Sequence, residues 1–246
     1  MPHLSLVVPV HNGAERLPAS LEAIAQYFAA QSYAWEVVLV DDGSDAVTRG
    51  ILEAWVSCHP GFTLLRNQVN RGKGHAVARG MLAATGAFRV FTDADLAYPM
   101  EEVGNTLRAL EAGSDAVVAC RVLPESRYLI SPSFFNYLYT RHLASRAFNL
   151  MIRAILLPGI LDTQAGLKGF TAGAAGLLFS RLTVAGFGFD VELLFVARRH
   201  GLKVTQRPVT FRYDSEPTTV RFIADAFDMA ADLALIRWRD WWGRYR

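Results

Sequence analysis

Two carboxylates stand two positions apart at the end of an apolar run, in Asp93-Ala94-Asp95. The run before them, Phe88–Thr92, is typical of a buried strand, so both side chains are expected where that strand leaves its sheet. Mg²⁺ and Mn²⁺ prefer oxygen ligands and commonly bind through one or two carboxylates together with substrate phosphates. The pair therefore predicts a divalent-metal site for a phosphorylated ligand. The alternative is a turn that also caps the helix starting near Pro99, and the motif alone does not decide between them.

Two further loops carry groups suited to a nucleotide. Asp41 ends the apolar run Val37–Val40 and could accept hydrogen bonds from a base or a ribose. Lys73 lies between glycines at a predicted helix start, where it could reach a phosphate or the base with help from backbone N–H groups. A solvated lysine is the alternative for Lys73. A helix-capping turn is the alternative for Asp41–Ser44, and it is favoured for Asp42.

The first 120 residues alternate between strand and helix patterns. Apolar runs predict strands over Leu4–Val10, Val37–Val40, Phe62–Leu65, Phe88–Thr92 and Asp115–Cys120. Helical spacing predicts helices over Arg16–Ala30, His75–Ala84 and Met100–Ala112, and a further helix that contains Ile51, Leu52 and Trp55. Continuous apolar strands between helices are typical of an α/β fold with a mostly parallel sheet covered on both faces. Ligands of such sheets bind at the carboxyl ends of the strands, where four charged residues are expected to meet: Asp41, Asp93, Asp95 and Arg121.

The composition and a few simple sequence patterns exclude several classes of protein. The chain has 246 residues, 52% of them hydrophobic and 20% charged, which suits a globular domain with a sizeable core. A net charge of +2 gives no indication of a nucleic-acid partner. No apolar stretch approaches the roughly 20 residues of a transmembrane helix, and no signal-peptide pattern is found. His11-Asn12-Gly13 after the first strand lacks the glycine pattern of NAD or FAD sites. With Cys58 and Cys120 in unrelated segments, reduced thiols in the cytosol are expected.

The pattern changes from Tyr128 onward. Tyr128–Leu161 mixes aromatic residues with arginines and predicts one or two helices, and the polar loop Asp162–Lys168 follows. Val220–Arg246 is helical in pattern and ends with three tryptophans among four arginines. Aromatic and basic side chains together suit a membrane interface with anionic headgroups, while a core or dimer interface is the alternative. Asp190 and Glu192 resemble a paired-carboxylate site, although a helix start explains them nearly as well.

Four segments, in this order and spacing, carry a family resemblance: Val7–Asn12, Val40–Ser44, Asn70–Gly74 and Thr92–Asp95. Together they make the chain resemble the family 2 glycosyltransferases of the GT-A fold, whose sheet is Rossmann-like. A narrower resemblance, to the polyprenyl-phosphate (dolichyl-phosphate) sugar synthases, rests on further segments: Ala119–Arg121, Arg141 with Ser145 and Asn149, and Asp162–Lys168. The last of these is closer to the glucosyl than to the mannosyl branch.

The resemblance implies an organisation for the chain. It would form a single domain over 1–246, with a nucleotide-sugar-binding half at 1–121 and an acceptor-binding half at 122–219. The segment 220–246 would be an amphipathic, membrane-associating helix. The chain departs from the family where His11-Asn12-Gly13 stands in place of the frequent Tyr-Asn-Glu.

The resemblance also implies roles for individual residues. The nucleotide sugar would be held by Pro9, His11, Asp41, Lys73 and Asp93. Asp93 and Asp95 would bind Mg²⁺ or Mn²⁺ and the diphosphate. The lipid phosphate would be held by Arg121, Arg141 and Ser145. Asp162 and Gln164 would lie near the reacting sugar and, with the two arginines, would form the catalytic group.

The implied reaction is an inverting, metal-dependent transfer of a hexose to a polyprenyl phosphate, giving polyprenyl-phosphate β-glucose from UDP-glucose. A phosphate monoester is largely dianionic at neutral pH, so the acceptor needs positioning by arginines more than it needs a general base. The enzyme is expected to be peripheral on the cytoplasmic face of a membrane, and a homodimer or a separate membrane subunit stays open. The alternatives are GDP-mannose as donor, a saccharide acceptor, or a nucleotide-sugar-binding module without turnover.

Overall fold

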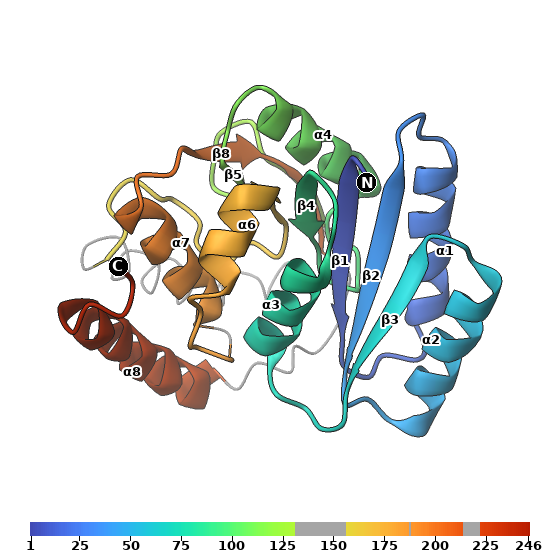
Figure 1. Ribbon diagram of the computed structural model, residues 1–246, viewed down its shortest axis with the longest axis horizontal. Helices are drawn as coiled ribbons and strands as arrows, with labels where there is room; N and C mark the ends of the chain where they lie inside the picture. Colours follow the sequence, from blue (N-terminus) through green and yellow to red (C-terminus); the bar gives the residue numbers. More distant parts are fainter. Residues whose placement is uncertain (131–155, 187, 214–221) are drawn as a thin grey trace.

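The computed structural model describes residues 1–130, 156–186, 188–213 and 222–246 (Figure 1). Arg141 and Ser145, two of the predicted acceptor residues, lie outside this part, as does most of the helical region predicted after Tyr128. Where the structure does describe that region, it begins with strand β6 (Arg127–Ile130) and not with a helix.

A seven-stranded sheet with the order β3-β2-β1-β4-β7-β5-β8 forms the centre of the molecule. Its strands are β1 (Leu4–Val10), β2 (Trp35–Asp42), β3 (Phe62–Asn67), β4 (Phe88–Phe91), β5 (Ala116–Cys120), β7 (Lys168–Thr171) and β8 (Val204–Pro208). Strand β7 runs antiparallel to β4 and β5, and the other neighbouring pairs are parallel. The predicted α/β fold with a mostly parallel sheet is confirmed. The assignment of Lys168 to a polar loop is wrong, because this residue opens β7 and is fully buried.

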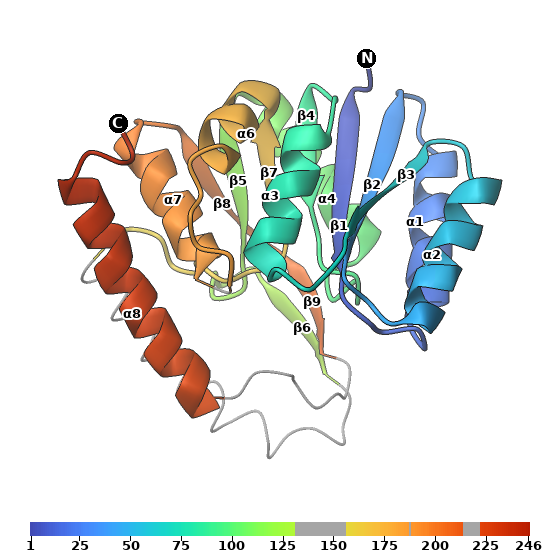
Figure 2. The same ribbon diagram turned by 60° about the horizontal axis from the view of Figure 1, so that its bottom comes forward.

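Helices cover both faces of the sheet, because each strand presents apolar side chains alternately to the two sides. Helices α1 (Leu17–Ala29), α2 (Ala46–Cys58) and α4 (Met100–Glu111) lie on one face, and α3 (Lys73–Ala83), α6 (Ala172–Phe179) and α7 (Phe189–Arg199) lie on the other (Figures 1 and 2). In β1, for example, Val7 packs into the core under α3 while Val8 packs into the core under α1. Strands from both predicted halves of the chain therefore share one sheet and two cores.

A two-stranded ribbon extends from the carboxyl edge of the sheet (Figure 2). Strand β6 follows β5 and pairs in parallel with β9 (Thr210–Tyr213), which follows β8. The ribbon continues the parallel pairing of β5 with β8, and the Arg127 N–H donates to the Val209 carbonyl at 3.0 Å. It brings aromatic side chains of both strands to the end of β5.

The C-terminal helix α8 (Phe222–Trp241) packs outside α7. Tyr245, just beyond it, is fully buried: its hydroxyl donates to Glu192 at 2.6 Å, and its carbonyl oxygen lies 2.8 Å from Nε2 of His200. An ion pair of 2.8 Å between Arg199 and Asp240 adds to this attachment. No helix in the described ranges has the length and apolar character needed to cross a bilayer.

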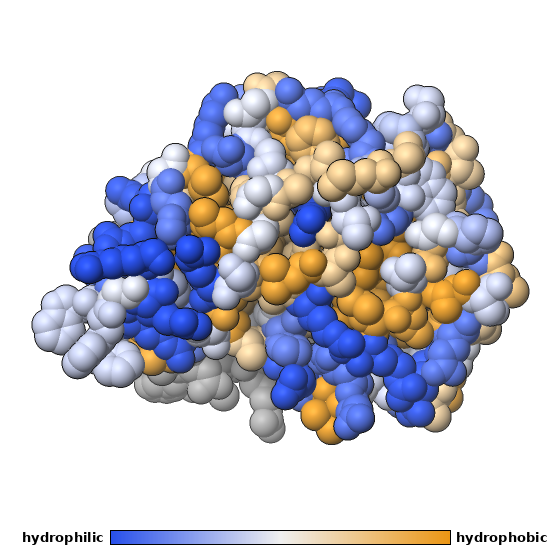
Figure 3. Space-filling view, in the orientation of Figure 1, coloured by the Kyte–Doolittle hydropathy of each residue, from blue (hydrophilic) through white to orange (hydrophobic). Residues whose placement is uncertain are grey.

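The last turn of α8 and the residues after it expose an aromatic surface, the tryptophan cluster, formed by Trp238, Trp241 and Trp242. These side chains are 56%, 78% and 68% exposed, and the ring centroid of Trp242 lies 6.0 Å from that of Trp238 and 5.8 Å from that of Trp241. In Figure 3 this end of the molecule shows pale and hydrophilic residues, whereas apolar residues gather beside α3 and the edge strand β3.

Candidate active site

Asp93 and Asp95 lie in a tight turn directly after β4, at the carboxyl edge of the sheet. The turn is closed by the Leu96 N–H, which donates to the Asp93 carbonyl at 3.1 Å, and by the Ala97 N–H, which donates to Oδ1 of Asp95 at 3.1 Å. Neither carboxylate caps α4, because the residue before this helix is Pro99 and no side chain caps it. The motif therefore opens a turn, and the helix-capping part of the alternative interpretation is wrong.

The carboxylates of this turn are close enough to affect each other. Burial and the negative charge of Asp93 raise the pKa of Asp95. Lys73, the first residue of α3, compensates part of this charge, because its Nζ lies 2.5 Å from Oδ1 of Asp93. Burial lowers the pKa of Lys73, but the carboxylates of Asp93, Asp190 and Asp95 outweigh it, so that the net shift is upward. Lys73 is thus a charged partner of Asp93 and not a solvated lysine.

The backbone N–H groups of Gly72, Gly74 and His75 at the start of α3 already have hydrogen-bond partners in the protein, which corrects the prediction for these three groups that they would help to bind phosphate. The Gly72 N–H donates to Oδ2 of Asp42 at 2.8 Å, and the Gly74 N–H donates to the Ala185 carbonyl at 2.8 Å. Gly72 has φ +95°, and a Cβ there would lie 2.5 Å from the oxygen of Ala185. The glycines around Lys73 are needed for this close packing.

Asp41 and Asp42 end strand β2 and serve different purposes. Asp42 accepts hydrogen bonds from Asn67 at 2.6 Å and from the N–H groups of Arg71 and Gly72, so it orders the loop before α3. The helix-capping role predicted for Asp42 is wrong, because Asp45 caps α2. Asp41 accepts from the Ser44 N–H at 2.8 Å.

The second carboxylate oxygen of Asp41 is well placed for a ligand. Oδ2 of Asp41 is buried, lies 3.5 Å from Nε of Arg66, and receives no hydrogen bond from the described residues. A buried carboxylate oxygen of this kind suits the N–H of a base or the hydroxyl of a ribose. His11, just after β1, is exposed and has Nδ1 2.9 Å from the Asp42 carbonyl, and Pro9 lies in β1 opposite Val40.

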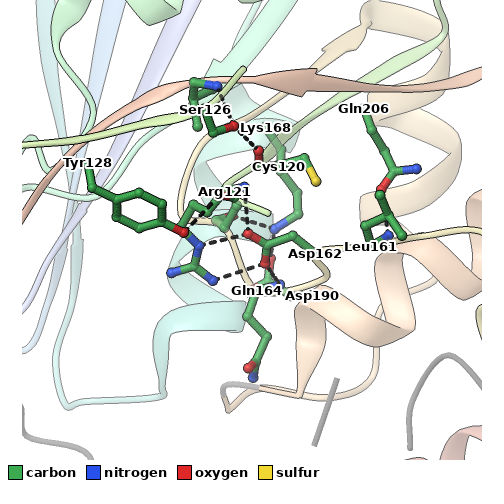
Figure 4. Close-up of polar contacts among 12 residues, drawn as sticks. Cys120, Arg121, Ser126, Tyr128, Leu161, Asp162, Gln164, Lys168, Asp190 and Gln206 are labelled. Atoms are coloured by element: carbon green, nitrogen blue, oxygen red, sulfur yellow. Dashed lines mark hydrogen bonds and ion pairs between the residues drawn. The ribbon is translucent and has the colours of Figure 1, made fainter. Parts of the chain in front are cut away.

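Arg121 and Asp162 form a second charged pair, at the end of β5 (Figure 4). Nε of Arg121 donates to Oδ2 of Asp162 at 2.7 Å, Nη2 donates to Oδ1 at 2.9 Å, and the Arg121 backbone N–H donates to Oδ2 at 3.0 Å. Burial raises the pKa of Asp162, but the guanidinium and these hydrogen bonds hold it below its usual range. The backbone N–H of Gln164 also donates to Oδ1 of Asp162 at 3.3 Å, while the Gln164 side chain extends away from this carboxylate (Figure 4).

Aromatic side chains surround the Arg121 guanidinium. The guanidinium carbon lies 5.6 Å from the ring centroid of Phe211 in β9, within the range of a cation–π contact. The Tyr128 hydroxyl in β6 donates to the Arg121 carbonyl at 2.8 Å, and Tyr98 packs against Phe211. Since Arg121 remains 29% exposed, its outer edge is open to a ligand. No pattern along the chain indicates that the β6–β9 ribbon supplies these rings.

A buried ion pair supports the loop between Asp162 and β7. Nζ of Lys168 forms an ion pair with Oδ1 of Asp190 in the first turn of α7 and donates to the Ala165 carbonyl at 2.6 Å. Burial lowers the pKa of Lys168 and raises that of Asp190, and their mutual attraction opposes both shifts. The sequence singled out Asp190 but paired it with Glu192. The structure separates them, since Glu192 accepts from the Thr183 and Val184 N–H groups, each at 2.8 Å.

Gly166 joins the two charged pairs. A Cβ at this position would lie 2.0 Å from Oδ2 of Asp93, so the loop that carries Asp162 packs directly against the Asp93 carboxylate. One short loop therefore holds together the two charged pairs at this edge of the sheet, Lys73 with Asp93 and Arg121 with Asp162. Spacing along the chain gives no signal for this contact, because it depends on the antiparallel insertion of β7.

The residues after β4 fit a divalent cation. Asp93 is 30% exposed, its neighbour Asp95 is a second carboxylate, and an ammonium group already lies against the pair. In the part of the chain that the structure describes, no group of three or more His, Cys, Asp or Glu side chains could hold a metal. Two carboxylates with oxygens of a bound diphosphate form a donor set that suits Mg²⁺ or Mn²⁺.

If Arg121 holds an acceptor phosphate, as the resemblance implies, replacing it with lysine is expected to raise the KM for the acceptor and to lower kcat/KM about 10- to 100-fold. Lysine keeps the charge but cannot make the bidentate contact with Asp162, and charge-assisted hydrogen bonds of this kind contribute about 1.5–3 kcal/mol. Steady-state kinetics with varied acceptor measure the effect, and Arg127→Lys, an exposed arginine of β6, is the matched control. Equal losses in donor binding would contradict an acceptor role for Arg121.

Comparison with known proteins identifies the family of this chain. A family model described as Glycosyl transferase family 2 matches residues 5–168. A dolichyl-phosphate beta-glucosyltransferase of Drosophila melanogaster is 33% identical over 85% of this chain and 66% of its own. Dolichyl-phosphate beta-glucosyltransferase ALG5D of Trichomonas vaginalis is 31% identical over 95% and 72% of the two chains. The human protein of the same name is 29% identical over 99% and 77%.

Solved structures show the same fold. Glucosyl-3-phosphoglycerate synthase from Mycobacterium tuberculosis in complex with UDP has a TM-score of 0.69 and 20% identity, covering 96% of this chain and 80% of that one. The same synthase with Mn²⁺, UDP-glucose and phosphoglyceric acid has a TM-score of 0.66 and 18% identity, covering 96% and 79%. The predicted GT-A type of fold is confirmed. Because the family model covers both charged pairs, from β1 to the start of β7, the chain belongs to glycosyltransferase family 2 and is a glycosyltransferase.

Proposed function

We propose that this glycosyltransferase transfers glucose from UDP-glucose to a polyprenyl phosphate and inverts the anomeric centre. The observation that carries the proposal is the meeting of two differently built sites at one edge of the sheet. One has paired carboxylates and a lysine, Asp93, Asp95 and Lys73, and the other presents a guanidinium, Arg121. The relatives named dolichyl-phosphate beta-glucosyltransferase support glucose and a lipid phosphate. The UDP complexes of the structural neighbour support the nucleotide.

The donor would bind across the ends of β1, β2 and β4. Asp41 offers the base or ribose a buried carboxylate oxygen that receives no hydrogen bond from the described residues, and Pro9 and His11 border the same strand ends. Asp93 and Asp95 would hold a divalent cation, which when bound neutralises negative charge on the departing diphosphate. Lys73 supplies a further positive charge at this position.

The acceptor phosphate would bind at the outer edge of Arg121. The contact with Asp162 uses Nε and Nη2, which leaves further N–H donors of the guanidinium for phosphate oxygens. Arg141 and Ser145, outside the described residues, are proposed as additional acceptor contacts on the resemblance alone. A dianionic phosphate attacks without losing a proton, so its reactivity depends on how these cations orient it.

Asp162 is proposed to position Arg121 and not to act as a base. Both of its carboxylate oxygens already accept hydrogen bonds from Arg121, and its pKa is held low. A carboxylate with these partners is a weak proton acceptor. Gln164, whose side chain extends out of this cluster, is proposed to contact the sugar.

Transfer assays with radiolabelled UDP-glucose, GDP-mannose and UDP-N-acetylglucosamine test this function on a short polyprenyl phosphate, with Mn²⁺ or Mg²⁺ present. We expect a lipid-soluble product from UDP-glucose that is absent when EDTA is added. A product from GDP-mannose alone would change the donor assignment. Failure of every donor to label the lipid would contradict the proposed reaction.

Membrane binding through α8 is part of the same proposal, because a lipid acceptor must be reached at a bilayer. The tryptophan cluster lies among exposed arginines, Arg237, Arg244 and Arg246, a composition that suits anionic headgroups. The helix begins on the side towards which the β6–β9 ribbon extends (Figure 2). The tryptophan cluster lies at the other end of the helix, so a bilayer would have to lie along the whole of α8 to reach the acceptor side of the edge (Figure 2).

Changing Trp238, Trp241 and Trp242 together to serine is expected to lower flotation with anionic liposomes severalfold, since the aromatic anchors are lost. The matched control replaces three exposed apolar residues elsewhere, Val47, Val69 and Leu82, with serine. Flotation equal to that of the unchanged protein would exclude the tryptophan cluster as the anchor.

A further inference from the structure

Lys73 occupies the position on Asp93 where a cation is needed. Its Nζ lies 2.5 Å from Oδ1 of Asp93, and the two side chains are 22% and 30% exposed. The contact is therefore close enough to be strong and open enough to be exchanged. The helix start that carries Lys73 is fixed, because the Gly72 and Gly74 N–H groups bond to Asp42 and Ala185. Only the flexible side chain can move.

The local charges make a divalent cation and this ammonium group competitors. Asp93 and Asp95 together carry two negative charges, and Lys73 neutralises one of them. A dication added to Asp93 would lie beside the Lys73 ammonium, and the repulsion is substantial in a partly buried site. Lys168 does not reduce this repulsion, since it is a further positive charge and is already paired with Asp190. A diphosphate brought by the donor would remove the conflict, because its negative charge can receive Lys73.

We propose that Lys73 is an internal counter-ion that competes with the divalent cation for Asp93 and transfers to the diphosphate when the donor binds. Cation and donor then bind as a coupled pair, each raising the affinity for the other by the same factor. In the absence of donor, the ammonium keeps the affinity of the edge for free cations low. This inference rests on the proposed function, because it assumes a cation and a diphosphate at this edge.

Mn²⁺ binding, followed by the electron paramagnetic resonance signal of free Mn²⁺, tests the competition without any turnover. The titration is made with the unchanged protein and with Lys73→Met, each with and without saturating UDP. We expect Lys73→Met to bind Mn²⁺ alone about tenfold more tightly, since the competing charge is gone. We also expect UDP to tighten Mn²⁺ binding less in this variant than in the unchanged protein.

Matched variants separate this effect from a general change of charge or fold. Lys203→Met removes the same charge at the amino edge of the sheet, before β8, and should leave Mn²⁺ binding unchanged. Lys73→Gln repeats the loss of charge with a polar side chain and should behave as Lys73→Met does. Thermal unfolding with and without Mn²⁺ verifies that each variant is folded and gives a second measure of binding.

Two results would overturn the inference, and they differ in what else they affect. If Mn²⁺ binds the unchanged protein with UDP but Lys73→Met leaves its affinity for Mn²⁺ alone unaltered, Lys73 is not a competitor and the proposed function stands. If Mn²⁺ binds neither protein even with saturating UDP, the cation site itself is wrong and the proposed function falls with it.

Discussion

Replacing Asp93 with asparagine is expected to lower kcat at least about 1000-fold, the largest loss for any single change at the donor side. The amide keeps the size of the carboxylate, so the tight packing of Gly166 against this side chain is preserved. What is lost is the negative charge that would hold a cation at the diphosphate, and removing such stabilisation from a transition state typically costs two to three orders of magnitude or more. Single-turnover transfer with saturating UDP-glucose measures the chemical step.

The control for this change is Asp115→Asn, a carboxylate of the same type at the opposite edge of the sheet. Oδ2 of Asp115 accepts from the Lys203 N–H at 2.8 Å, so its loss affects a surface contact and not the proposed site. We expect this variant to retain most of its activity. If Asp93→Asn retained more than about a tenth of the unchanged kcat, Asp93 would not hold the diphosphate or its cation.

The buried ion pair behind the site should give the largest effect on stability. Asp190→Leu leaves the Lys168 ammonium buried without a counter-charge, and breaking such a pair costs about 3–5 kcal/mol in free energy of unfolding. Urea unfolding of the single variants Asp190→Leu and Lys168→Met and of the double variant gives the coupling between them. The double variant is expected to recover most of the stability, because it places no unpaired charge in the core.

Activity should not recover with stability in the double variant. Lys168 also donates to the Ala165 carbonyl, and this bond fixes the loop that carries Asp162 and packs Gly166 against Asp93. Loss of the bond is expected to lower kcat about 100-fold, as small displacements of positioned groups do. A double variant that is both stable and fully active would show that the pair has no part in positioning the site.

The fold was largely accessible from the sequence because its signals are local. Valine-rich runs such as Leu4–Val10, separated by helical spacing, identify the strands and helices of the first 120 residues. The first residue of strand β7, Lys168, was assigned to the preceding loop because it is charged. Only the tertiary partner Asp190, 22 residues further on, makes its burial possible.

The positions of the site residues could be predicted from the sequence where they follow from the ends of the strands. The rule that ligands bind at the carboxyl ends of parallel strands places Asp41, Asp93 and Arg121 on one edge, and the structure has them there. This rule could not show which of these side chains form ion pairs or hydrogen bonds with other residues. The ion pair of Lys73 with Asp93 and the ordering role of Asp42 depend on contacts between loops that are not neighbours in sequence.

The most direct measurement is anomalous scattering from crystals grown with UDP and Mn²⁺. A manganese peak about 2 Å from carboxylate oxygens of Asp93 or Asp95 and from the diphosphate is expected, with the Lys73 ammonium on the diphosphate and no longer on Asp93. A manganese ion bound elsewhere, with UDP away from these carboxylates, would contradict the assignment of this edge as the donor site.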